Sequence, residues 1–199
     1  MINITVDPTL KDTYASIRLG CLFFDADVKS SDDSFWQYMN EDVLPKVRAE
    51  IEGKEWSEIP GVRGSRLAYK AFGRTPGRYR VSSESLLRRI RREDELYHIN
   101  SVVDVNNLVS VTTGLSVGSY DVSKLNGDVV LRKALAGEGY EGIGKDFLAW
   151  ETEKFTGKFL DKFKSEFFLG FNNRNRRRIT TTNLIFDSSN TMCGEACVG

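Results

Sequence analysis

Residues 100–121 read NSVVDVNNLVSVTTGLSVGSYD, and this stretch decides the fold class. Its first part, Asn100 to Thr113, is mostly apolar and long enough to predict a helix. Gly114 follows at the position where glycine commonly ends a helix. Ser116 to Asp121 then predicts a strand. The chain therefore changes at Gly114 from a helix-rich part to a strand-rich part.

The residues before this stretch predict mostly helices. Apolar residues recur at helical spacing between 33 and 51, where Pro45 is expected to kink the helix or to set off its first half. Further helices are expected over 65–72 and from about 82, with Ser82 or Ser83 as the N-cap and 59–64 as a loop. The remaining expected elements are an edge strand over 2–6, a helix starting at Asp7-Pro8, and a buried strand over 16–24.

The residues after Gly114 predict strands joined by turns. Asn126-Gly127 is typical of a hairpin turn. Beyond the strand at 116–121, the expected strands cover residues 128–133, 157–160, 166–171 and 179–186. Without regular β-α-β alternation, the pattern indicates an α+β fold, in which a helix-rich first half packs on a mixed or antiparallel sheet.

Length, charge and cysteine content limit the class of protein. With 199 residues the chain is expected to form a single domain over 1–199, with a flexible C-terminal tail from about residue 187. Its 28 Lys and Arg balance 28 Asp and Glu, which excludes a globally basic nucleic-acid binder but not a local basic patch. Three cysteines and no long apolar run favour a cytoplasmic protein without membrane contact.

Three short motifs suggest chemistry that their surroundings do not support. Residues 137–142 match a dinucleotide fingerprint, but they contain two glutamates and precede no long amphipathic helix. Cys193 and Cys197 could supply only part of a metal site, and His98 is the only histidine and lies beside no nucleophile motif. We therefore expect no cofactor and no metal.

Two arginine clusters are the strongest local charge signals. The first, Arg88 to Arg92, is partly balanced by the acids at 93–95 and predicts a solvated helix face. The second cluster, Arg174 to Arg178, has no acidic residue nearer than Glu166 and Asp187. Its arginines are interleaved with asparagines. Arginine forks bind phosphates, and amides can contact nucleotide edges. The candidates for RNA binding are Asn172, Arg174, Arg176, Arg177 and Arg178.

A series of ordered blocks resembles the tRNA-editing domain of the phenylalanyl-tRNA synthetase beta subunit, in its free-standing form. The resemblance is strongest over 69–144, and a weaker one follows in 171–175 and 178–180. The blocks are residues 80–89, 99–110, 114–121 and 124–128, then Leu131-Arg132 and Gly137-Glu138.

The resemblance implies an α+β fold that binds the aminoacylated 3′ end of tRNA. It implies a hydrolase that acts in trans on the ester of a mischarged tRNA, or a module that binds tRNA or RNA without catalysis. A third possibility is a small-molecule protein that reuses the amino-acid pocket. Nothing in these residues resembles an aminoacylation site, so the chain itself is not expected to charge tRNA.

The resemblance also suggests a pocket, with departures from the synthetase pattern. The histidine of the synthetase motif falls on Gly118 here, and the later glycine-rich segment is missing, so no catalytic residue is assigned. The pocket candidates are Arg80, Ser82, Ser83, Asp104, Asn107, Gly118, Tyr120, Asp121 and Glu138. Asp104 and Asn107 share a helix face, and we favour a structural role for them over a ligand-binding one.

Overall fold

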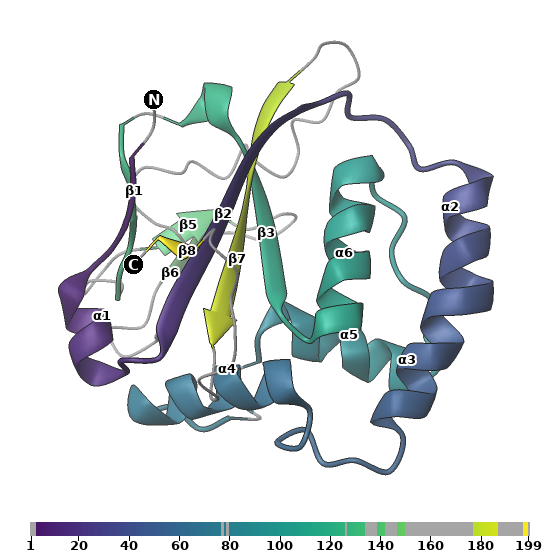
Figure 1. The fold of residues 1–199 in the computed structure, drawn as a ribbon, viewed down its shortest axis with the longest axis horizontal. Helices are drawn as coiled ribbons and strands as arrows, with labels where there is room; N and C mark the ends of the chain where they lie inside the picture. The colour runs from purple at the N-terminus through teal and green to yellow at the C-terminus, as the bar shows by residue number, and fades with distance from the viewer. Residues whose placement is uncertain are drawn as a thin grey trace.

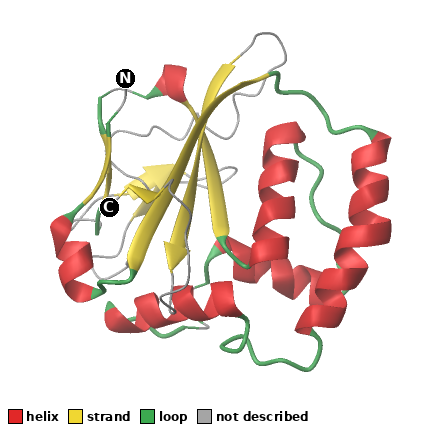
Figure 2. Cartoon of the chain, in the orientation of Figure 1, coloured by secondary structure: helices red, strands yellow, loops and turns green. Residues whose placement is uncertain are grey.

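The computed structural model describes residues 3–76, 78, 80–125, 127–133, 139–141, 147–149, 177–186 and 197–198. An antiparallel sheet lies at the centre, with a helical layer on one side and a smaller layer with β1, α1 and β4 on the other (Figures 1 and 2). The α+β class predicted from the sequence is therefore confirmed. In the described ranges no helix is long and apolar enough to cross a membrane.

The central sheet has four strands in the order β3-β7-β2-β8. Strand β7 pairs with both β2 and β3, so that Ile17 lies opposite Phe186 and Ser116 opposite Leu184. All three pairings are antiparallel. The strands are β2 (Ile17–Ala26), β3 (Ser116–Asp121), β7 (Arg177–Phe186) and β8 (Cys197–Val198).

Strand β2 is buried only in its first half. Ile17 and Leu19 have exposed fractions of 0% and 3%, whereas Leu22 and Phe23 reach 57% and 49%. The prediction of a buried strand over 16–24 is thus wrong for its second half. Apolar content identified the strand correctly, but the helices and β4 cover only the end that holds Ile17 and Leu19.

Two further strand pairs lie beside this sheet. β1 (Ile4–Val6) pairs in parallel with β4 (Val129–Leu131), and β5 (Gly139–Glu141) pairs with β6 (Phe147–Ala149) in antiparallel fashion. Between β3 and β4 lies the short 3-10 helix η2 (Val122–Lys124). Asn126 lies outside the described residues, and among the described strands β4 pairs with β1 and β3 with β7, so the hairpin predicted at Asn126-Gly127 is not seen between β3 and β4.

Helix α1 (Pro8–Thr13) begins as the sequence predicts. The Asp7 carboxylate accepts a hydrogen bond from Thr9 N at 2.8 Å, and proline occupies the first turn, where it loses no helical hydrogen bond. This hydrogen bond and the one from the Thr9 hydroxyl lower the pKa of the Asp7 carboxyl. Leu10 from α1 packs with Ile17, Leu19, Ala68, Val129 and Leu131 in one of the two apolar clusters.

The 33–51 helix is continuous but changes its hydrogen-bond pattern before Pro45. It consists of α2 (Asp33–Tyr38), a π-helical turn (Met39–Val43) and α3 (Leu44–Ile51). A proline ring clashes with the carbonyl four residues earlier, and its nitrogen cannot donate. The wider turn, in which Leu44 N donates to Met39 O, removes this conflict. The sequence predicts that Pro45 kinks the helix or sets off its first half; in the structure it follows a π-helical turn instead.

Helices α4 (Pro60–Ala71), α5 (Ser82–Arg91) and α6 (Ser101–Thr113) complete the helical part. Residues Met39, Val43, Val47, Ile51, Val62, Leu87, Ile90 and Val111 form the core of the second apolar cluster. Asn100 caps α6 by accepting from Val102 N and Val103 N, and Gly114 ends it with φ 73°. Both ends of α6 therefore agree with the sequence prediction.

Helix α4 starts five residues before the predicted helix at 65–72, so the loop expected over 59–64 is wrong. The two glycines in this part suggested a loop. In the structure, however, Gly61 lies against the C-terminal end of α6. A Cβ built on Gly61 would lie 2.6 Å from Gly114 C and 2.7 Å from Thr113 O. Position 61 requires glycine because the backbone of α4 lies directly against the backbone of residues 113 and 114 at the end of α6.

Candidate functional site: the polar contacts of α5, α6 and β3

Ser83 connects the start of α5 to strand β3. Its side chain is buried, its Oγ lies 3.1 Å from Ser116 Oγ, and its backbone N donates to the same oxygen at 3.2 Å. The N-cap of α5 is Val81, and no side chain caps the helix, so the prediction of a Ser82 or Ser83 cap is wrong. Ser82 and Arg80 are both exposed.

Asp104 anchors α6 to the chain segments that precede it. Its carboxylate is 1% exposed and accepts hydrogen bonds from Ser31 Oγ at 2.6 Å and Ile99 N at 3.0 Å. The structural role favoured for Asp104 is thereby confirmed. Asn107 lies nearly one turn further along and is half-buried. Its side chain forms no hydrogen bond within the described part of the chain.

Asn106 is the polar residue of α6 that points to the sheet, and sequence reasoning missed it. Its Nδ2 donates to Ser119 Oγ on β3 at 2.7 Å. Val102, Asn106 and Ser110 are all buried and follow one another at intervals of four residues. This spacing marks the inward face of a helix and could have singled out Asn106 from the adjacent pair of asparagines.

Gly118 and Tyr120 share one face of β3, because side chains alternate along a strand. A Cβ on Gly118 would lie 3.7 Å from the Tyr120 hydroxyl oxygen, an ordinary contact, so position 118 has room for a side chain. Tyr120 packs against the cluster around Leu10 and Leu19, and this burial raises its pKa to about 12. The phenol therefore stays protonated at neutral pH and cannot act as a general base there.

Asp121 closes the end of β3. It is 4% exposed, and its Oδ1 accepts from Ser123 N at 3.0 Å and from Ser123 Oγ at 2.6 Å. These bonds start the 3-10 turn after the strand. The structure thus places Ser83 beside the first residue of β3, Gly118 and Tyr120 within the strand and Asp121 at its last residue. Asp104 faces Ser31 and Ile99.

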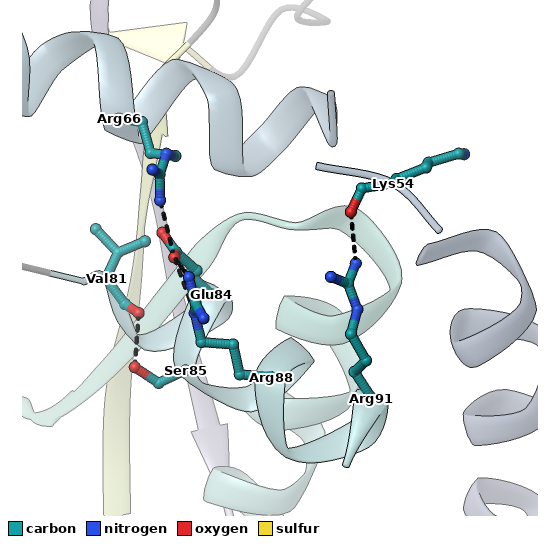
Figure 3. A network of polar contacts seen from close by, with 7 residues as sticks. All are labelled: Lys54, Arg66, Val81, Glu84, Ser85, Arg88 and Arg91. Carbon is teal, nitrogen blue, oxygen red and sulfur yellow. Dashed lines mark hydrogen bonds and ion pairs between the residues drawn. The ribbon is translucent and has the colours of Figure 1, made fainter. Parts of the chain in front are cut away.

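The arginines of α5 are committed to partners within the chain. Arg66 of α4 and Arg88 of α5 both contact the same oxygen of the buried Glu84, at 3.0 and 2.9 Å (Figure 3). Arg91 donates to the Lys54 carbonyl at 2.9 Å (Figure 3), and its guanidinium lies 3.8 Å from the Trp56 ring centre.

The remaining arginines of this helix turn follow the same pattern. Arg89 donates to the Glu95 carbonyl, and Arg92 pairs with Asp94 at 2.7 Å. Arg88, Arg89 and Arg91 are half-buried, so the expected solvated face of four outward arginines is wrong for these three. Arg88 and Arg91 pack on Trp56, and Arg89 packs on Tyr97.

The structure places the other predicted motifs as follows. His98 is exposed and stacks on Trp36, with ring centres 3.5 Å apart. Gly139–Glu141 of the dinucleotide-like motif forms strand β5. Arg177 and Arg178 lie in β7, opposite Ala26 and Asp25. Glu138, Asn172, Arg174 and Arg176 lie outside the described residues.

The fold and these contacts define the class of protein as an α+β domain in which two helices are bonded to one strand. The Ser83 hydroxyl joins α5 to β3, and the Asn106 amide joins α6 to β3. Comparison with known families then identifies the part of the chain that carries them. Residues 64–155 match the family model of the B3/4 domain, a domain found in the phenylalanyl-tRNA synthetase beta subunit. No curated protein and no solved structure matches the chain significantly.

The matched segment includes the whole of 69–144, where the sequence resemblance is strongest, and so confirms that resemblance. It contains α5, α6, β3 and most of α4. The hydrogen bonds between Ser83 and Ser116 and between Asn106 and Ser119 therefore lie wholly within the matched segment. The anchor from Asp104 to Ser31 joins this segment to residues that precede it.

Proposed function

We propose that this chain binds the aminoacylated 3′ end of tRNA and hydrolyses the ester of a mischarged tRNA in trans. The observation that carries this proposal is the B3/4 match over residues 64–155, a domain that occurs in a tRNA synthetase. We further propose that the protein acts in the cytoplasm, where charged tRNA is used.

Hydrolysis of an aminoacyl ester requires few catalytic groups from the protein, because this ester is already activated. A positioned water, backbone N–H donors for the oxyanion and the neighbouring tRNA hydroxyl could suffice. Among the candidate residues, Asn107 is the one we propose as a ligand contact, since it is half-buried and lies in the segment that matches the B3/4 domain. Asp104, Asp121 and Ser83 support the site by holding its elements in place.

A tRNA-binding module without catalysis is the second candidate function. The observation that favours it is Gly118, which occupies the position of the synthetase histidine and presents no side chain. The structure leaves room there for a Cβ, so the absence of a side chain is not imposed by packing.

We expect the purified chain to release the amino acid from at least one mischarged tRNA without ATP or added metal. Asn107→Ala should slow this release about tenfold, the equivalent of one hydrogen bond, without loss of folding. Release of labelled amino acid from a panel of mischarged tRNAs measures both. If no mischarged tRNA in a broad panel loses its amino acid above the uncatalysed rate while tRNA still binds, the hydrolase proposal is wrong and the non-catalytic binding module replaces it.

The arginine-asparagine segment near residue 175 provides a second expected result. Replacing Arg174, Arg176 and Arg177 with alanine should weaken binding to all tRNA species alike, because phosphate contacts carry no sequence information. The logarithm of affinity should also fall less steeply with salt, by up to about one unit per lost contact. Binding curves at several salt concentrations test this; unchanged affinity and slope in a folded variant would leave these arginines without a role in binding.

A further inference from the structure

One long segment around α4 contains basic residues but no acidic ones. Between Glu58 and Glu84 there is no acidic residue, whereas six basic ones occur: Arg63, Arg66, Lys70, Arg74, Arg78 and Arg80. The whole chain has as many acidic as basic side chains. A segment with this imbalance produces a local positive potential that the net charge conceals.

Helix α4 directs part of this charge to the solvent. Gly61, Val62, Ser65 and Ala68 are buried, while Arg63, Leu67 and Lys70 are exposed. The exposed residues follow at intervals of four and three, so they form one stripe along the helix. Arg63 and Lys70 are separated by seven residues, which is about 10 Å along a helix.

Nothing acidic neutralises this stripe among the described residues. Arg63, Lys70 and Arg80 form no ion pair there. The nearest carboxylate that follows in the chain, Glu84, is 1% exposed and already shared by Arg66 and Arg88. The Arg66–Glu84 pair also fixes the beginning of α5 beside α4 (Figure 3), and the exposed Arg80 lies two residues before the start of α5.

We propose that Arg63 and Lys70, together with Arg80, form a docking surface for the phosphate backbone of RNA, here called the α4 face. The inference rests on the proposed function, since it gives the phosphate backbone of the tRNA a place to bind. Guanidinium and ammonium groups spaced along a helix and free of carboxylates complement a regular array of phosphates.

An anionic membrane does not fit the same surface. A helix that lies in a membrane interface needs an unburied apolar face. In α4 the apolar residues Val62 and Ala68 are fully buried in the protein, and Leu67, at 38%, is the exposed large apolar side chain of this helix. The α4 face therefore offers charge but almost no apolar area for insertion.

The test compares two triple variants that remove the same charge. Arg63→Ala, Lys70→Ala and Arg80→Ala together should weaken binding of tRNA and of a duplex RNA oligonucleotide about tenfold and reduce the salt slope by about two units. The matched control is Lys46→Ala, Lys54→Ala and Arg92→Ala. Its residues are exposed, and two of them are already paired, with Asp42 and Asp94. The control should bind like the unmodified chain.

The outcomes separate this inference from the proposed function. Equal weakening by both triple variants would show a net-charge effect and overturn the α4 face, and so would unchanged binding by the first. If no mischarged tRNA is hydrolysed but duplex RNA binds through Arg63, Lys70 and Arg80, the face stands and the hydrolase fails. If the chain binds neither RNA, or binds only vesicles of anionic lipid, the face is overturned.

Discussion

Replacing both Arg66 and Arg88 with methionine should lower the free energy of unfolding by about 4 kcal/mol, the typical cost of leaving a buried charge without a partner. Each single replacement should cost only about 1 kcal/mol, because the other arginine still holds Glu84. Methionine keeps an apolar stem, so the contact of residue 88 with Trp56 is largely retained. Denaturant unfolding of the four proteins of the cycle measures the difference.

A third replacement identifies the cause of the loss. Adding Glu84→Gln to the double variant removes the charge but keeps the shape of the side chain, and it should restore about 2 kcal/mol. If the double variant costs no more than the sum of the single ones, the two arginines do not share Glu84 energetically. If glutamine restores nothing, lost packing explains the instability.

Gly61→Ala should lower the free energy of unfolding by about 3 kcal/mol. In an open helix the same change would stabilise by up to about 1 kcal/mol, because alanine is the better helix former. Here the added Cβ would meet three backbone atoms of residues 113 and 114 within 2.7 Å, and backbone cannot move aside as a flexible side chain can. The helices α4 and α6 would have to separate.

Gly73→Ala is the matched control for this prediction. Gly73 has φ 74° but nothing within 4 Å of a built Cβ, so it reports the conformational cost alone, about 1 kcal/mol. Thermal or denaturant unfolding of both variants distinguishes a clash from a backbone preference. A Gly61→Ala protein as stable as the original would mean that α4 and α6 do not touch at this point.

The parts of the fold that the sequence predicted are those whose signals are local. The ends of α6 depend on Asn100 and Gly114, which act within one turn of the helix. The start of α4 was missed because Gly61 is a weak helix former by itself, and its purpose is visible only beside Gly114. The prediction of a hairpin at Asn126-Gly127 likewise used only local residues. Among the described strands, β4 pairs with β1, which comes from the other end of the chain.

The candidate site follows the same division. Asp104 could be recognised as an anchor because an acid in a mostly apolar helix needs buried partners, and Ser31 and Ile99 supply them. Ser83 was given the wrong partner, because the sequence shows the helix start but not that Ser116 lies beside it. Asn106 was missed because its partner Ser119 is found only once β3 is in place.

The long-range strand pairs also determine when this protein can finish folding. Helices α5 and α6 and strand β3 lie close together in sequence and can associate early, but Ile17 must wait for Phe186 and Ile4 for Val129. Bringing such distant residues together costs chain entropy before any contact repays it, which slows folding. On the ribosome, β2 and its exposed Leu22 and Phe23 would remain unpaired until β7 emerges, and this interval is when the chain is most open to aggregation.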